Sequence, residues 1–320
     1  MHEQGLLFPL GLDLQPAREM MKRIMTARFA KNTLITYRSG WRIFERWCVS
    51  AGRCAMPAVP QTILDYASWC LASGFRLQTV HHRLKSINYY HRQENLPLPF
   101  NAEGNAFLRN ARRALCERPQ GMQPLSPEQL AQISEALLAR GNHLNVRDRS
   151  MIILGFACGW RCSELMSLDL SDIRWHPQGI ELWLAKSKTD QEGNGRAVGV
   201  HYGSTPLTCP LQALKSWLAI RGNWSGPLFV AVTPGRLLTR RRLDPDSVRR
   251  AVKRALKLVG EDPQPFGAHS LRSGMVTAAI EAGASETAIM QRTGHHSYEM
   301  IRRYTRSAMA LRSNPMAGVL

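Results

Sequence analysis

Acidic residues are scarce in this sequence of 320 residues. It contains 24 Asp and Glu against 42 Lys and Arg, which gives a formal net charge of +18. The acidic residues form no cluster able to hold Mg²⁺. A field this positive attracts nucleic-acid phosphates, and such binding should weaken steeply as the salt concentration rises. RNA and anionic lipid are alternative partners on charge alone.

Long apolar runs and an export signal are also absent. No apolar stretch approaches the roughly 20 residues that span a bilayer. The opening MHEQGLLFPLGLDLQ lacks the pattern of a cleaved signal peptide. The basic residues are spread along many segments, which favours nucleic acid over a membrane surface. We therefore expect a cytoplasmic protein without membrane contact.

The cysteines do not form a recognisable metal or disulfide pattern. There are seven, with no CxxC pair, and in a chain without an export signal reduced thiols are the default. The adjacent His295 and His296 have no Cys or carboxylate partner at metal-ligand spacing, and we interpret His296 as incidental. The sequence predicts no metal and no cofactor.

A chain of 320 residues can form two domains with separate cores. Prolines and a glycine interrupt helical periodicity within CERPQGMQPLSPEQL. A new helix should follow, because Ser126 suits the N-cap, Pro127 the first helical position and Gln129 a capping box. We expect an N-terminal helical domain at 1–118, a linker at 119–127 and a second domain at 128–320.

Apolar residues recur at helical spacing through most of the chain. The only clear sheet signal is GIELWLAK and GRAVGVHY around the polar turn KTDQEGN, which predicts an antiparallel hairpin. The predicted fold class is mainly α with a small antiparallel β-sheet in the second domain. The expected helices include Thr33 to Cys48, Thr79 to Glu94, those starting near Glu128 and Val146, Leu211 to Arg221, and one after Asp246.

The last third of the chain places histidines and an arginine around one tyrosine. His269 lies three residues before Arg272 in AHSLR, and His295 lies nine residues before Tyr304 in GHHSYEMIRRY. A phenol has a pKa of about 10, so a nucleophilic tyrosine needs a base and positive charge close by. Histidine titrates near neutrality and can take or position that proton.

Further cations lie upstream. Arg161 is in GWRCSEL, at a turn between two apolar helical stretches, and AKSKTD supplies Lys186 and Lys188. In-line attack on a phosphodiester places negative charge on its non-bridging oxygens, which guanidinium groups bind in a bidentate manner. A lysine can protonate the leaving 5′-oxygen. Together with the tyrosine and histidines, these residues could cut a phosphodiester without a metal ion.

These motifs resemble those of the tyrosine recombinases, the integrase family that includes the Xer proteins, Cre and many phage integrases. FACGWRCSELMSLDLSDI is similar to the family's first Arg box, AHSLRSGMVTAAIEAGAS to its second box and QRTGHHSYEMIRRYT to its Tyr box. NTLITYRSGWRIFERWC and TVHHRLKSINYYH are similar to its core-binding domain. The resemblance covers almost the whole chain and implies a two-domain DNA clamp.

The resemblance also implies site residues. Glu164 matches an acidic position of the first Arg box, where it would orient catalytic groups. The lysine is Lys188 if Ser-Lys-Thr matches the family's Thr-Lys-Thr-like hairpin, and Lys186 if the hairpin is the shorter Xer-like one. Their equal strand parity does not separate them, and we prefer Lys188. The implied catalytic set is Tyr304, Arg161, Lys188, His269, Arg272 and His295.

Taken singly, these residues have plainer interpretations. An isolated cation is usually solvated, and Tyr304 could be a core aromatic, although the arginines around it argue against a dry position. The basic stretch RLLTRRRLDPDSVRRAVKRALKLVG could lay arginines along DNA or be only a solvated face. The DNA-binding candidates within it are Arg240, Arg241, Arg242, Arg249 and Arg250.

The resemblance implies a site-specific recombinase that cleaves and rejoins double-stranded DNA through a covalent 3′-phosphotyrosine and a Holliday junction. It would act in the cytoplasm on the nucleoid, as a dimer on each site and a tetramer in the synapse. The segment RSAMALRSNPMAGVL could dock on a neighbouring subunit or be a frayed terminus. The alternatives are a catalytically silent DNA-binding accessory protein of the same fold and relaxation of DNA as in type IB topoisomerases.

Overall fold

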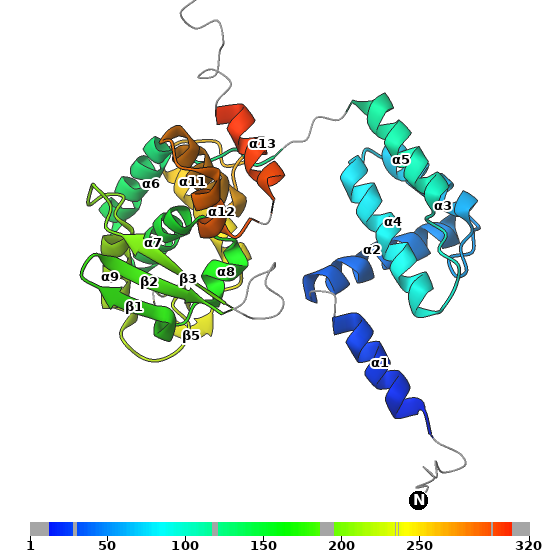
Figure 1. The fold of residues 1–320 in the computed structure, drawn as a ribbon, viewed down its shortest axis with the longest axis horizontal. Helices are drawn as coiled ribbons and strands as arrows, with labels where there is room; N and C mark the ends of the chain where they lie inside the picture. The colour runs from blue at the N-terminus through cyan, green and yellow to red at the C-terminus, as the bar shows by residue number, and fades with distance from the viewer. Residues whose placement is uncertain are drawn as a thin grey trace, which may run out of the picture. The chain divides into compact units, whose positions relative to one another are not determined.

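The computed structural model describes residues 13–27, 31–116, 121–185, 195–233, 235, 237–295 and 297–308. The chain divides into two compact units, Met1–Pro119 and Gln120–Leu320, and each is considered by itself (Figure 1). Within the described residues the fold is mainly helical, with small antiparallel sheets in the second unit, so the predicted fold class is confirmed. No helix in these ranges is both long and apolar enough to cross a membrane.

The first unit is helical and has an aromatic core. The core lies between α2, α3 and α4, and its fully buried side chains include Phe44, Tyr66, Leu84 and Ile87. The helices predicted over Thr33 to Cys48 and Thr79 to Glu94 are confirmed as α2 and α4. The helices are α1 (Gln15–Ala27), α2 (Lys31–Ser50), α3 (Pro60–Ala72), α4 (Leu77–Gln93) and α5 (Ala102–Leu115).

The second unit is organised around α7 (His143–Cys158). This helix packs against α6 (Pro127–Arg140), α9 (Pro210–Arg221), α10 (Asp246–Leu258) and α11 (Ala268–Glu281). Because neighbours surround it, four consecutive side chains at 151–154 are buried, which only a helix covered on all sides allows. The short α8 (Cys162–Ser167) follows α7, and α12 (Glu286–Thr293) and α13 (Tyr298–Ala308) follow α11.

The first helix of the second unit begins as the sequence predicts. The Gln129 N–H donates to the Ser126 Oγ at 3.1 Å, and the Ser126 N–H donates to the Gln129 Oε1 at 3.1 Å. Pro127 occupies the first turn, where its missing N–H costs nothing. The predicted capping box is confirmed.

The larger sheet has the strand order β1 (Ile173–His176), β2 (Gly179–Leu184) and β3 (Arg196–His201), all antiparallel. Leu182 pairs with Val198, and both side chains are buried on the face that meets the core. The predicted hairpin is therefore confirmed as β2 and β3. Residues 186–194 of its connection, which include Lys186 and Lys188, lie outside the described residues.

Two pieces of β-structure were not predicted from the sequence. These are β1 and the pairing of β4 (Val230–Val232) with β5 (Leu238–Arg242). β1 buries only one of its four side chains in part, and β5 ends in three exposed arginines. Such edge strands form by backbone pairing with a neighbour and carry no apolar alternation for a sequence to reveal.

The segment that precedes α6 lies along the start of α11. The Gln123 N–H donates to the Pro265 carbonyl at 2.9 Å, and the Leu125 N–H donates to the Ser270 carbonyl at 3.0 Å. A Cβ atom on Gly274 of α11 would overlap the Leu125 carbonyl, so only glycine permits this close approach. The segment is therefore fixed to the helix that carries the second predicted motif.

Candidate active site

Arg161 lies in the turn between α7 and α8. Gly159 ends α7 in the left-handed region, with φ of +62°, which favours glycine. Glu164 accepts from the Arg161 backbone N–H at 2.9 Å and from its Nη1 at 2.6 Å. The Glu164 side chain is 1% exposed, whereas that of Arg161 is 22% exposed. The carboxylate thus fixes the guanidinium group while leaving part of it open to a ligand.

Arg272 comes from the first turns of α11 and is buried. Its Nη1 donates to the Gly159 carbonyl at 2.8 Å and to the Thr293 carbonyl at 2.7 Å, so it joins α11 to the ends of α7 and α12. Its Nη2 is buried and makes no hydrogen bond. Burial, and then the nearby Arg161, lower the pKa of Arg272 to about 10. A buried cation with an unsatisfied donor is a position where a phosphate oxygen would be stabilised.

Arg196, the first residue of β3, adds a third guanidinium group that the sequence analysis missed. Its Nη1 donates to the carbonyls of Gln291 and Arg292 at 2.8 and 3.0 Å, at the end of α12. Its Nη2 lies 4.0 Å from the Glu164 Oε2 and makes no hydrogen bond. Burial is the main reason that its pKa is lowered. The only signal in the sequence is its position directly after the polar turn of the predicted hairpin.

Tyr304 of α13 is paired with a histidine. Its hydroxyl lies 2.8 Å from the His269 Nε2, and its ring packs against the small apolar cluster that contains Ile289 and Ile301. The pKa of His269 is lowered by burial, then by Arg272 and Arg161. His269 is therefore neutral near pH 7, as a group must be to accept the phenolic proton.

His295 follows α12 and is also buried. Its Nδ1 lies 2.7 Å from the Thr293 Oγ1. Burial, and then the charge of Arg272 and Arg161, lower the pKa of His295 to about 3. This ring is neutral at physiological pH in the free protein. Thr293, which the sequence analysis did not single out, thus contacts two of the predicted site residues.

The structure brings together five of the six residues in the predicted catalytic set. Contacts and mutual electrostatic effects on the pKa values connect them across α8, α11, α13 and the end of α12. Three guanidinium groups face one paired carboxylate there, which leaves two excess positive charges for an anionic ligand. The assembled residues are Arg161, His269, Arg272, His295 and Tyr304.

Other predicted features lie outside the described residues. They include both candidate lysines, His296 and the segment from 309 to the carboxyl terminus. The described flanks of the hairpin connection run to Ala185 and resume at Gly195, and Leu184 pairs with Arg196 in the register of β2 and β3. Because Arg196 contacts the candidate site, the start of β3 connects the hairpin to that site. All seven cysteines lie within the described residues and have free thiols.

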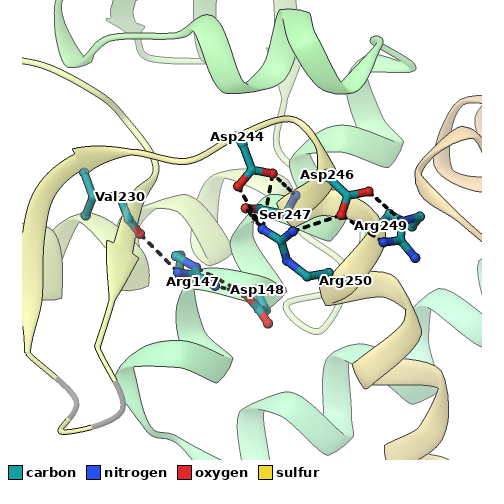
Figure 2. Close-up of polar contacts among 8 residues, drawn as sticks. All are labelled: Arg147, Asp148, Val230, Asp244, Asp246, Ser247, Arg249 and Arg250. Atoms are coloured by element: carbon teal, nitrogen blue, oxygen red, sulfur yellow. Dashed lines mark hydrogen bonds and ion pairs between the residues drawn. The ribbon is translucent and has the colours of Figure 1, made fainter. Parts of the chain in front are cut away.

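The predicted DNA-binding arginines occupy β5 and the start of α10. Arg249 and Arg250 both donate to Asp246, and Arg250 also bonds to Asp244, at distances of 2.6 to 2.9 Å (Figure 2). The two arginine side chains are 48% and 46% exposed. These pairs hold the guanidinium groups at the surface, where they can still be shared with a phosphate.

Arg242 has a structural role that its sequence context did not suggest. Its Nη1 donates to the carbonyls of residues 166–168, and its Nη2 to the Asp169 Oδ1 at 2.5 Å. Carbonyls at a helix end have no partners inside the helix, so Arg242 satisfies those at the end of α8. In the part of the chain that the structure describes, Arg240 and Arg241 form no ion pair. They are the more available members of this basic stretch.

Known proteins match this chain along most of its length. Residues 123–310 match the phage integrase family. An integrase/recombinase described as a xerD homolog, from Selenomonas ruminantium, is 31% identical over 299 residues, covering 92% of this chain and 87% of the relative. The tyrosine recombinase XerD of Pseudomonas putida is 25% identical over 290 residues, covering 87% of this chain and 88% of the relative.

Solved structures share the fold. A lambda integrase tetramer bound to a Holliday junction aligns with a TM-score of 0.61 and 18% identity, covering 92% of this chain and 77% of that one. The XerH site-specific recombinase bound to its difH substrate aligns with a TM-score of 0.56 and 18% identity, covering 85% and 76%. At these identities the likeness concerns the fold alone.

A phenol in contact with a neutral histidine, beside buried guanidinium groups, is suited to an enzyme that attacks phosphodiesters with a tyrosine. The family match spans more than half of the chain, and the relative from Selenomonas ruminantium aligns with 92% of it. The chain belongs to the phage integrase family, the tyrosine recombinases. The resemblance inferred from the motifs is confirmed.

Proposed function

We propose that this protein is a site-specific DNA recombinase that breaks and rejoins strands through a covalent 3′-phosphotyrosine. The observation that carries the proposal is the 2.8 Å contact between the Tyr304 hydroxyl and the His269 Nε2, next to Arg161 and Arg272. Tyr304 attacks phosphorus and its proton passes to His269. The bond from phosphorus to the 5′-oxygen breaks, and that oxygen takes a proton from a lysine.

The arginines stabilise the charge that builds up during attack. Arg161 has donors free of Glu164, and Arg272 has a buried Nη2 without a partner. Both are suited to the non-bridging oxygens of the scissile phosphate, whose negative charge rises in the transition state. Glu164 orients Arg161 rather than reacting. Reversal of the same steps, with the 5′-hydroxyl of a partner strand as nucleophile, rejoins the DNA in a new combination.

Lys188 is our choice for the group that protonates the leaving oxygen, with Lys186 as the alternative. Both belong to the connection of a hairpin whose next strand begins with Arg196, a residue of the site. This continuity supports a role for the hairpin in catalysis. The two lysines are distinguished by the experiment described in the Discussion.

The first part of the chain binds DNA, and the second part carries out the reaction. Residues 1–118 form the core-binding domain, 119–127 the linker and 128–320 the catalytic domain, so that the two domains clamp double-stranded DNA. The arginines that contact the DNA backbone are Arg240, Arg241, Arg242, Arg249 and Arg250. The net charge of +18 supports this partner. The protein acts on the nucleoid in the cytoplasm.

The active assembly is a dimer on each recombination site and a tetramer in the synapse, which passes through a Holliday junction. The lambda integrase that shares this fold was solved as a tetramer on a Holliday junction, which supports the proposal. The two alternatives are a catalytically silent DNA-binding protein of the same fold and a relaxing enzyme of the type IB topoisomerase kind. The contact between the Tyr304 hydroxyl and His269 disfavours the catalytically silent DNA-binding protein.

A suicide substrate tests the proposal. Nicked duplexes taken from the DNA that flanks the gene should trap a covalent complex with the wild-type protein and none with Tyr304→Phe. Strand exchange between two such duplexes separates recombination from simple relaxation. Binding to the flanking DNA without a covalent complex on any candidate site would support the silent alternative.

A further inference from the structure

Thr293 ends α12 and is completely buried. Its Oγ1 lies 2.7 Å from the Ile289 carbonyl, one turn earlier in the helix, and 2.7 Å from the His295 Nδ1. Its own carbonyl accepts the bond from the Arg272 Nη1 at 2.7 Å. One residue therefore holds both a histidine and an arginine of the candidate active site.

The donor and acceptor inventory fixes the direction of these bonds. A carbonyl oxygen only accepts, so the single proton of the Thr293 hydroxyl goes to Ile289. Toward His295 the Oγ1 can then only accept, which means that the Nδ1 carries a proton. In a neutral imidazole the opposite nitrogen, Nε2, is consequently unprotonated and presents a lone pair.

The surroundings keep the ring neutral. The charged and titratable groups that act on His295 are Arg272, Arg161, His269 and Arg196, and each of them disfavours a positive charge on the ring. Burial acts in the same direction. The free protein therefore contains a histidine with one defined tautomer rather than a mixture.

We propose that Thr293 is a positioning residue for the reaction, which fixes the orientation of the His295 ring and keeps the ring proton on Nδ1. The inference rests on the proposed function, because it concerns how a residue of that site is used. Thr293 acts through His295 and touches no reacting atom. The hydroxyl is what matters, since the Thr293 carbonyl that binds Arg272 is present in any residue at this position.

Three variants isolate the hydroxyl. Thr293→Val keeps the volume and the β-branch but removes the oxygen, whereas Thr293→Ser keeps the oxygen. Thr287→Val makes the same chemical change on an exposed position of α12 and serves as the control. Because one neutral hydrogen bond is lost, single-turnover cleavage by Thr293→Val should fall about three- to tenfold. DNA affinity should stay within about twofold, and Thr293→Ser and Thr287→Val should cleave like the wild type.

The tautomer itself is read from the ring nitrogen chemical shifts of histidine-labelled protein, without DNA. The His295 signal is assigned by its loss in His295→Gln. We expect a protonated Nδ1 in the wild type and Thr293→Ser, and a mixture of tautomers in Thr293→Val. A wild-type ring protonated at Nε2, or an unchanged tautomer in Thr293→Val, would overturn the proposal.

This design separates the inference from the proposed function. If Thr293→Val does not fold, the tautomer in the wild type and in Thr293→Ser decides the question alone. If the wild type forms no covalent complex with any DNA, the proposed function fails, while the tautomer measurement still confirms or refutes the role of Thr293.

Discussion

Replacing Arg161 by alanine should weaken the fold as well as catalysis, because it leaves a buried carboxylate without its main partner. The Glu164 side chain is 1% exposed and accepts from the Arg161 Nη1 at 2.6 Å. Removing one partner of a buried pair commonly costs about 3–5 kcal/mol. Arg196, with its Nη2 4.0 Å from the Glu164 Oε2, still compensates part of the charge. We therefore expect a loss of about 2–3 kcal/mol.

A double-mutant cycle tests this explanation. Hydrogen exchange of amides in α7 and α11 during urea titration would report the stability of the second unit in the wild type, Arg161→Ala, Glu164→Gln and the double variant. Glutamine carries no charge, so the double variant should regain at least half of the lost stability. Cleavage should not be regained, because a missing transition-state contact costs about a hundredfold to a thousandfold in rate.

Two results would refute the reasoning. Additive effects of the two substitutions on stability would show that Arg161 does not compensate the charge of Glu164. Equal losses of DNA affinity and cleavage in Arg161→Ala would show that the arginine is an ordinary phosphate anchor. The expected pattern is a large loss of cleavage with nearly unchanged affinity, since many other cations contribute to binding.

Four further predictions concern the same site. Tyr304→Phe should bind DNA but form no covalent complex, as seen by denaturing electrophoresis; a trapped complex would mean that another tyrosine, such as Tyr298, is the nucleophile. Lys188→Ala should lose most cleavage and recover it when sulfur replaces the 5′-bridging oxygen, because a thiolate leaves without a proton; selective rescue of Lys186→Ala would assign the role to that lysine. Chelators should leave cleavage intact, and a strict divalent-metal requirement in the cleavage step would contradict the mechanism. The pKa of His295 in the folded protein, about 3, lies below its ordinary value of about 6.5, so the contribution of the neutral ring to stability is present above pH 6.5 and is lost as the pH falls. By this linkage, the free energy of unfolding should fall by at most about 2 kcal/mol between pH 7 and pH 5. In His295→Gln the denaturant midpoint should change less with pH over that range than it does in the wild type.

Local signals in the sequence were enough for the helices and for one hairpin. The capping box at Ser126 and the apolar alternation of GIELWLAK act between residues close in the chain, so they can be read from it. β5 could not be found in this way, because its arginines are exposed and its order comes from pairing with β4.

For the candidate site, too, patterns within short stretches of sequence could be read, whereas contacts between distant segments could not. The five assembled residues are spaced in recognisable motifs, and the chemistry of a tyrosine nucleophile explains why these residue types occur together. Arg196 and Thr293 were missed because their roles depend on contacts between β3, α8 and α12 that no spacing encodes. The bonds of Arg242 to the end of α8 were missed for the same reason, because charge is visible in a sequence and such contacts are not.

The bonds of Gln123 and Leu125 to the start of α11 affect where this protein can be joined to another. A chimera that exchanges the first unit would naturally be cut at the helix start, Ser126. That junction would discard two backbone bonds and the close contact that Gly274 makes possible. The helix that would be released carries His269 and Arg272. Grafts should therefore retain the native chain from Gln123 onward, and those joined at Ser126 should lose activity even when the whole chimera still binds DNA.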